Sequence, residues 1–415
     1  MVPNLITALT GPLSELEERI LEAAPIIERW LRMEWMEHTP PIYATTRIHN
    51  AGFKLCALDV DLFPRGWQRL SADTISQAVL AAQSVIEKLC PEARRLLIVP
   101  ENGVPDADEC ASLARLKTIF QMTGLDVRYG SIDPALSRSV ELRLPGEAAP
   151  AQLVPVERER TRLMAGSFDP CTILLGNELR AGSPGILEEL PGQYLQPPLQ
   201  AGWSVRRRSR HRSYYMDAAK RLGKLIGVDP WLLAPLYEAP EDKGAGALEA
   251  TRGAADALLA KIRRKYRTYH IMERPCLLLA SDAGPRSAPV HTIYDARHIT
   301  AAMLPAHPLL QEGVPTRERI ANDAAEPWVY SIDRYIVGAY YCQHSGDSNE
   351  MCSVATHSRF VPMNMAENAS ILRPAAGETN RFYMHGVIAR LALVAASYEL
   401  EATDPEWQAM QQDDD

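Results

Sequence analysis

The chain has 415 residues, of which 46% are hydrophobic and 23% charged, a composition that excludes a disordered or fibrous protein. Its formal net charge of −8 disfavours a protein built mainly to bind nucleic acid. No apolar run reaches the roughly 18 residues of a membrane span, and no basic segment precedes the apolar stretch at the N-terminus, so we expect a cytoplasmic protein with no membrane partner.

The cysteines and histidines show no metal-binding spacing. The seven cysteines are odd in number and lack CxxC pairs, which argues against a disulfide framework and a zinc ribbon. We expect most of them to pack as small apolar side chains. Since the ten histidines form no HExxH motif either, we predict no zinc site.

The first half of the chain changes from helices to an alternation of helices and strands. Apolar residues at helical spacing predict a helix over 14–38, which Pro25 should kink or divide. The next pattern predicts helices at 71–90 and 107–123 and strands at 94–100, 125–130 and 171–179. Such an alternation is typical of a doubly wound α/β sheet.

Two of these strands end in the same pair of residue types. Glu101 and Asn102 follow one strand, and Asn177 and Glu178 follow another. Doubly wound sheets bind ligands at the carboxyl ends of their strands, but Asn is also a common turn residue. Because the pattern occurs twice, we favour a site over a pair of turns.

A basic island follows a Pro- and Gly-rich segment at 181–203. "VRRRSRHR" contains Arg206, Arg207, Arg208, Arg210, His211 and Arg212. Guanidinium groups bind carboxylates and phosphates bidentately, so the island predicts an anion site, with a solvated basic surface as the alternative. Helices are expected at 214–226 and 248–269.

The last third contains a hairpin where a phosphate loop would lie. Strands at 276–280 and 290–294, the second leading into a helix, flank a loop with Gly284 as its one glycine and prolines at 285 and 289. A strand at 308–314, paired strands within 326–344 and a helix at 382–402 complete the prediction. The carboxylates of Glu312, Glu326 and Asp333 lie on or beside these strands, where oxygen ligands suit magnesium.

Long segments of the chain resemble a known family. "HTPPIYATTRIHNAGFKLCALDVDLFPRGW", "QYLQPPLQAGWSVRRRSRH" and "AEPWVYSIDRYIVGAYY" are similar to the proteobacterial type of glutamate–cysteine ligase, the ATP-dependent enzyme of the first step of glutathione synthesis. The resemblance covers almost the whole chain. It implies that ATP phosphorylates the γ-carboxylate of glutamate and that the amine of cysteine then attacks the acyl phosphate.

The resemblance also implies an α/β fold with an N-terminal doubly wound α/β substrate domain followed by an ATP-grasp-like α+β nucleotide clamp. On the sequence the domains are residues 1–200, a connecting and first clamp segment at 201–270, an ATP-grasp-like domain at 271–405 and an acidic tail at 406–415. The implied cofactors are ATP and Mg²⁺. The implied partners are glutamate, cysteine or analogous amino acids, and the oligomeric state stays open.

Site residues carry over by position. The catalytic set is Asp282, Arg286 and Arg210. The nucleotide set is Asp282, Gly284, Gln311, Glu312 and Val314, with 311–314 as the implied hinge strand beside the adenine. The metal set is Glu326 and Asp333. The substrate set is Asn50, Lys54, Glu101, Asn102, Arg206, Arg207, Arg208 and His211.

The phosphate side departs from the family pattern. Ala280 stands where the family has a lysine, and Pro285 and Pro289 each remove a backbone N–H that could bind an anion. Cys342 stands in place of an arginine, while Arg286 offers one new positive charge. Two hypotheses therefore stay open. One is an active ligase, and the other is a divergent paralogue that has lost ATP-driven ligation and binds amino acids or a partner, or catalyses different chemistry.

Overall fold

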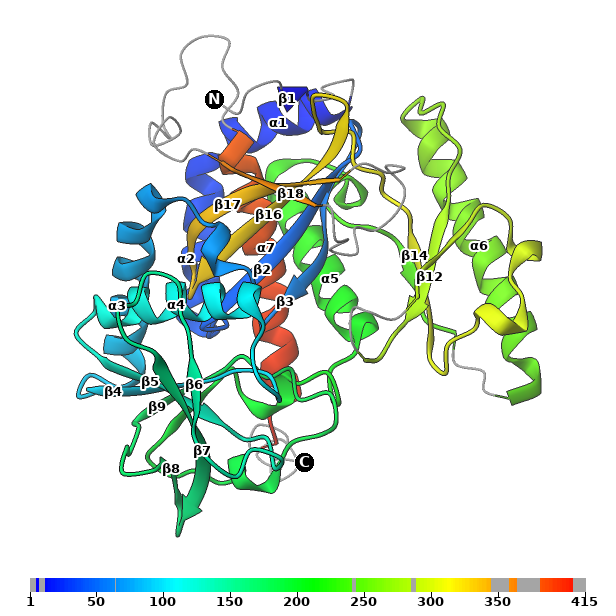
Figure 1. Cartoon of the computed structure of the whole chain (residues 1–415). Coiled ribbons are helices and arrows are strands. Elements are labelled where there is room, and N and C mark those ends of the chain that lie inside the picture. Colours follow the sequence, from blue (N-terminus) through cyan, green and yellow to red (C-terminus); the bar gives the residue numbers. More distant parts are fainter. Residues whose placement is uncertain are drawn as a thin grey trace, which may run out of the picture.

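The computed structural model describes residues 5–6, 12–63, 65–240, 244–284, 289–344, 358–363 and 381–405. In these residues the strands form a central antiparallel sheet, a largely parallel sheet and a small antiparallel sheet. Figure 1 shows the parallel sheet below the central one and the small sheet in a lobe to the side. None of the described helices is both long and apolar enough to cross a membrane.

The central sheet joins the two ends of the chain. β16 pairs with β2 on one side and with β17 on the other, so that Trp328 lies opposite both Arg47 and Tyr340. Its strands are β1 (Leu5–Ile6), β2 (Tyr43–Asn50), β3 (Leu55–Asp61), β15 (Arg319–Ile320), β16 (Asp323–Ile332), β17 (Tyr335–His344) and β18 (Arg359–Pro362). The predicted pairing within 326–344 is confirmed, with Asp333 in the turn at a φ of 50°.

Helices cover the face of this sheet that lies behind it in Figure 1. They are α1 (Pro12–Glu22), α2 (Ala24–Glu37), α5 (Arg208–Ile226) and α7 (Arg381–Ala402). α7 is apolar on every side, as expected of a helix that packs against both α5 and the sheet. The predicted break at Pro25 is confirmed, since α1 ends just before it and α2 begins with it in its first turn.

The parallel sheet has the order β10-β9-β4-β5-β7-β6, with β8 paired to β7. Its strands are β4 (Arg95–Val99), β5 (Asp126–Ser131), β6 (Val140–Leu142), β7 (Ala151–Glu159), β8 (Arg162–Ala165), β9 (Thr172–Leu175) and β10 (Tyr194–Gln196). Thus the predicted alternation is confirmed. Both helices, α3 (Ile75–Leu89) and α4 (Ala107–Gln121), pack on the face toward the central sheet.

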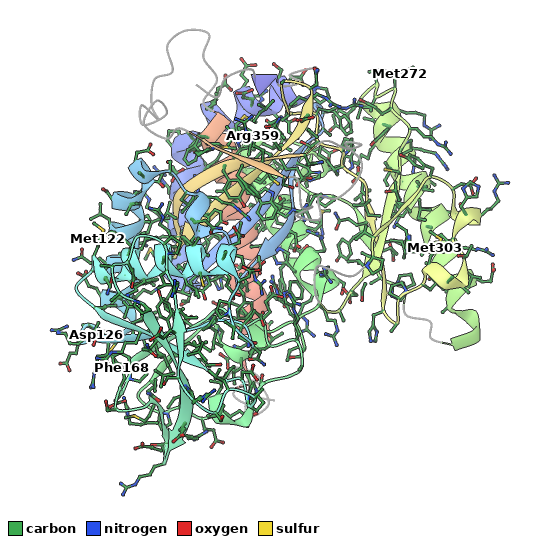
Figure 2. The ribbon with its side chains drawn as sticks, in the orientation of Figure 1. Met122, Asp126, Phe168, Met272, Met303 and Arg359 are labelled. Atoms are coloured by element: carbon green, nitrogen blue, oxygen red, sulfur yellow. The ribbon has the colours of Figure 1, made fainter. Side chains whose placement is uncertain are left out.

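In the described residues, the hairpin strand β8 and two short 3₁₀ turns, Gly185–Leu187 and Leu199–Ala201, pack on the second face of the parallel sheet, which differs from the predicted doubly wound arrangement. Leu97 and Ile173 on that face pack with Leu163 of β8 and with Leu187 and Ala201 from the connecting segment. Figure 2 labels Asp126 and Phe168 in this part of the molecule, where Phe168 is buried. The sheet is therefore wound on one side, because the chain returns from β7 to β9 through the β7–β8 hairpin.

The small lobe consists of one sheet and one long helix. Its strands are β11 (Tyr237–Glu238), β12 (Leu277–Ser281), β13 (His291–Ile293) and β14 (Pro308–Glu312), and α6 (Ala247–Thr268) covers one face. Figure 2 shows Met272 and Met303 on this lobe, and Met272 is 94% exposed. The predicted hairpin of β12 and β13 is confirmed, but two short 3₁₀ turns, Ala296–His298 and Ala301–Met303, follow it where an α-helix was expected.

The sheets do not follow the predicted boundary at residue 200. β1, β2 and β3 lie before that boundary, yet they share one sheet with four strands from beyond residue 318. As limits of folding units, residues 200, 270 and 405 remain a prediction.

Candidate functional site

The two strand ends with Asn and Glu lie side by side, because β4 and β9 are neighbouring parallel strands. Asn177 Nδ2 donates to Asn102 Oδ1 at 2.9 Å, and the Glu178 backbone N–H donates to Glu101 Oε1 at 2.9 Å. Arg65 Nη2 lies 3.3 Å from Glu101 Oε1. The residues predicted at the two strand ends therefore contact each other, and their hydrogen bonds link the ends of β4 and β9.

A cavity adjoins these strand ends. Pro100 and Gly176 line it from the parallel sheet, and Glu109 of α4, Tyr43 of β2 and Arg65 line it from the other sides. In open α/β sheets, ligands bind where neighbouring strands connect in opposite directions, and β4 and β9 flank such a point. Burial raises the pKa of the Glu109 carboxyl, and the charge of Arg65 opposes that effect.

Part of the basic island is engaged by a buried carboxylate of α7. Arg206 donates from Nε and Nη2 to Glu399, at 3.0 and 2.9 Å, and from Nη1 to the Val60 carbonyl. His211 Nδ1 lies 3.2 Å from the same carboxylate. Burial alone would raise the pKa of Glu399, but Arg206 and His211 lower it to about 2. These contacts give Arg206 and His211 a structural role, and their predicted part in substrate binding stays a prediction.

The remaining arginines of the island differ in environment. Arg207 donates to backbone carbonyls of its own loop, and Arg210 is exposed. Arg208 donates to the Ser281 carbonyl at 2.9 Å and stacks over Trp203. Arg212 is 5% exposed, and in the described part of the chain its Nε and Nη1 have no hydrogen-bond partner.

Arg212 was part of the island in the sequence, but it was absent from the predicted site set. The signal that could have found it is helical spacing, because α5 begins at Arg208 and buries Arg212, Tyr215, Ala219 and Leu222 on one face. Sequence reasoning started this helix six residues later, so that spacing was not visible.

The loop after β12 caps α5. The Ser209 backbone N–H donates to Asp282 Oδ1 at 2.6 Å, and Ser209 Oγ donates to Oδ2 at 2.8 Å. Gly284 follows with a φ of 84°, a left-handed conformation that favours glycine. Asp282, predicted to be catalytic, therefore has its carboxylate committed to a helix N-terminus. Arg286 lies outside the described residues, so its predicted role stays a prediction.

The predicted hinge strand β14 is fixed through Glu312. Its buried carboxylate accepts hydrogen bonds from Lys54 Nζ at 2.6 Å, Trp231 Nε1 at 3.1 Å and the Leu236 backbone N–H at 2.9 Å. Lys54 is fully buried and lies over the Trp231 ring. This ion pair links the small lobe to the residue before β3. Both Lys54 and Glu312 are buried in the described structure.

Gln311 points to the opposite face of β14. It is 6% exposed, and its Nε2 has no hydrogen-bond partner among the described residues. Leu278 lies beside it on β12, and Leu309 lies on the same face of β14. An amide donor between apolar side chains is the kind of group that can bind the edge of a flat heterocycle, so the place of Gln311 in the nucleotide site stays a prediction.

The described part of the phosphate loop fits less well. Ser281 to Gly284 supply one carboxylate and no cationic side chain, and Ala280 at the end of β12 supplies no charge. A carboxylate repels phosphate oxygens. Any cation that neutralises phosphates must therefore come from another segment.

Glu326 lies in a buried cluster on the central sheet. Arg47 Nη2 is 3.1 Å from its Oε2, while His49 Nε2 and His344 Nε2 are 3.2 and 3.5 Å from its Oε1. Burial alone would raise the pKa of Glu326, but Arg47 and His49 hold it well below its ordinary value. His49 Nδ1 also lies 2.6 Å from the carbonyl of Val314, so the cluster contacts the end of the hinge.

The predicted metal pair of Glu326 and Asp333 is not brought together. Asp333 lies in the turn beyond the far end of β16, about 23 Å away along the extended strand. Its neighbours are Lys88 and Arg334, and burial raises its pKa. One metal ion cannot bind both carboxylates. Among the described residues, no group of three or more His, Cys, Asp or Glu side chains is placed to hold a metal.

Asn50 occupies a similar interior position. Its Nδ2 donates to Glu318 Oε1 at 3.0 Å, and its Oδ1 accepts from the Gly52 backbone N–H. The described site is therefore a set of polar clusters around one junction, formed by the parallel-strand ends, the N-terminus of α5, the central sheet and β14.

Comparison with known proteins decides the family. The model of the GshA family, glutamate-cysteine ligase, matches residues 17–400. The chain belongs to this family. It is similar over 97% of its length to the whole chain of a crystal structure named "Putative gamma-glutamylcysteine synthetase" from Methylobacillus flagellatus KT, with 37% identity and a TM-score of 0.87.

The further comparisons add less. A glutathione synthetase-like effector (GSS30) from Globodera pallida, in apo form, shares 9% identity, with 84% of this chain and 79% of that chain covered and a TM-score of 0.37, which is too low to support an argument. No curated protein matches the chain.

Proposed function

We propose that the protein is an ATP-dependent ligase that joins the γ-carboxyl group of glutamate to the amine of cysteine or a related amino acid. Membership of the family carries this proposal, since the match extends over residues 17–400 and includes the junction described above. Glutamate–cysteine ligases use ATP, generally with Mg²⁺. Amino acids are therefore the expected substrates.

The proposed chemistry has two steps. The γ-phosphoryl group of ATP passes to a γ-carboxylate oxygen of glutamate, which gives ADP and an acyl phosphate. The amine then attacks the acyl carbon, and phosphate leaves as the amide forms and the amine loses a proton. Such reactions depend on positioning and on neutralising phosphate charge.

Three groups of described residues support the proposal. Gln311 and the apolar side chains beside it would hold the base, and the ion pair of Lys54 with Glu312 would keep that strand in place. The buried cluster around Glu326 presents Arg47 next to the end of the hinge. We assign no residue to Mg²⁺ from these contacts.

The divergent paralogue remains the second candidate, and a specific observation favours it. The carboxylate of Asp282 caps α5, and Ala280 leaves the end of β12 without the family's lysine. A protein of this kind would bind amino acids without consuming ATP.

One assay separates the two. The purified protein is incubated with Mg-ATP, glutamate and cysteine, phosphate release is measured, and γ-glutamylcysteine is detected by mass. Product above a control without enzyme supports the ligase. Absence of both phosphate and product, from a protein whose unfolding temperature rises with glutamate, overturns the ligase and supports the paralogue.

A further inference from the structure

Two cysteines lie together at the edge of the parallel sheet opposite the strand ends described above. Cys90 follows the last residue of α3, and Cys171 directly precedes β9. Both are partly buried, whereas the other four cysteines in the described ranges are buried. A reagent in solution therefore reaches this pair before it reaches the other described thiols.

Backbone contacts bring the two residues to the same place. The Cys171 backbone N–H and its Sγ both donate to the Arg95 carbonyl, at 3.1 and 3.2 Å. The chain turns tightly before Arg95, since the Ala93 N–H donates to the Cys90 carbonyl at 2.9 Å. Asp126, labelled in Figure 2, lies at this edge as well, because its N–H donates to the Arg94 carbonyl. The loop after α3 thus returns Cys90 to the strand beside Cys171.

The two thiols also contact each other. Burial raises the pKa of the Cys90 thiol, and so does the thiol of Cys171, which lies within reach of a side-chain hydrogen bond. Both side chains pack against the same apolar cluster, which includes the buried faces of α3 and α4. A disulfide requires two cysteines whose sulfur atoms meet without a large movement of the backbone. Adjoining thiols on anchored backbone meet this requirement.

We propose that Cys90 and Cys171 form a reversible disulfide by exchange with a low-molecular-weight disulfide. The thiolate of one cysteine attacks a sulfur of the small disulfide, whose S–S bond breaks and releases one small thiol. The second cysteine attacks the protein sulfur of this mixed disulfide, so the bond between Cys90 and Cys171 forms and a second small thiol leaves. The two cysteines lose two electrons and two protons, which the two released thiols take up. This inference does not depend on the proposed ligase function.

The disulfide has two measurable consequences. It closes a loop of about 80 residues that contains α4 and the strands from β4 to β8. Because such a cross-link restricts the unfolded chain, the oxidised protein should unfold at a temperature about 4 to 8 °C higher than the reduced protein. Because the raised pKa of Cys90 leaves little thiolate at neutral pH, the disulfide should form faster at pH 9 than at pH 7.

The test exposes the purified full chain to mixtures of reduced and oxidised glutathione, alkylates the remaining thiols and maps the peptides by mass. We expect a cross-linked peptide of Cys90 and Cys171 that increases with the share of oxidised glutathione and disappears in excess reduced glutathione. Cys90→Ser and Cys171→Ser should lack this peptide and unfold at the same temperature in both buffers. Cys110→Ala, at a buried cysteine of α4, is the matched control and should keep the cross-link.

Peptide mapping of the wild type decides the inference even where a serine variant fails to fold, and alanine variants then replace the serine variants. A wild type without the cross-linked peptide in the most oxidising mixture overturns the proposal. So does a wild type that carries only bound glutathione on Cys90 or Cys171, or that pairs either residue with a third cysteine. Equal unfolding temperatures of the oxidised and reduced wild type contradict the stabilising role of the disulfide.

Discussion

The buried ion pair between α7 and the start of α5 gives the sharpest stability prediction. In Glu399→Gln, Arg206 and His211 lose the only charge that faces them at hydrogen-bond distance in the described structure. The pKa of Glu399 is lowered from 4.5 to about 2, which corresponds to roughly 3 kcal/mol of favourable interaction with the charged form. Breaking a buried pair typically costs about 3 to 5 kcal/mol, so both arguments predict a loss of about 3 kcal/mol.

Urea unfolding at pH 7 measures this loss. Glu401→Gln is the matched control, because Glu401 lies on the same helix and pairs with the partly exposed His38, so it should cost about 1 kcal/mol or less. Equal stability of Glu399→Gln and wild type at pH 7 would refute the reasoning.

The pH dependence gives a second check. Because the pKa of Glu399 is lower in the folded protein than in the unfolded chain, the carboxylate stabilises the fold above pH 4.5 and loses this effect as the pH falls through about 2. The difference between wild type and Glu399→Gln should therefore be full at pH 6 and shrink below pH 4. A difference that stays constant down to pH 2 contradicts the assigned pair.

Three more variants test the junction. Lys54→Met leaves Glu312 buried without a cation and should lower the free energy of unfolding in urea by about 3 to 5 kcal/mol. Adding Glu312→Gln should restore part of that stability, and strictly additive effects in the double variant would disprove the coupling. Asp282→Ala removes the cap of α5 and should cost about 1 kcal/mol; an unchanged unfolding midpoint would argue against the cap. Gln311→Leu should raise the KM for ATP about tenfold and leave the KM for glutamate unchanged, as steady-state kinetics can show, whereas an unchanged KM for ATP would remove Gln311 from the base site.

The elements that the sequence predicted correctly depend on local signals. Pro25 interrupts the helix through its own backbone chemistry, whatever the helix packs against. The apolar run at 94–100 forms a strand between two helices, as the alternation of the pattern predicted. The apolar runs before Glu101 and Glu178 predicted that each residue follows a strand, as the structure shows. These features need no knowledge of distant partners.

The rest depends on contacts between distant parts of the chain. Nothing in residues 43–61 indicates that they pair with β16, since an apolar strand can join any sheet. Similarly, the sequence does not show that Glu399 lies beside Arg206, or that Ser209 donates to Asp282. Charged side chains reveal their roles only through such partners.

The pairing of β2 with β16 also bears on how the chain folds during synthesis. Arg47 lies opposite Trp328, so about 280 residues must be translated between the two partners, which takes on the order of tens of seconds. During that interval β2 and β3 present an unpaired edge that can associate with other chains. The parallel sheet is encoded entirely between them and can form earlier, so β16, β17 and helix α7 should be the last elements to join β2 and β3.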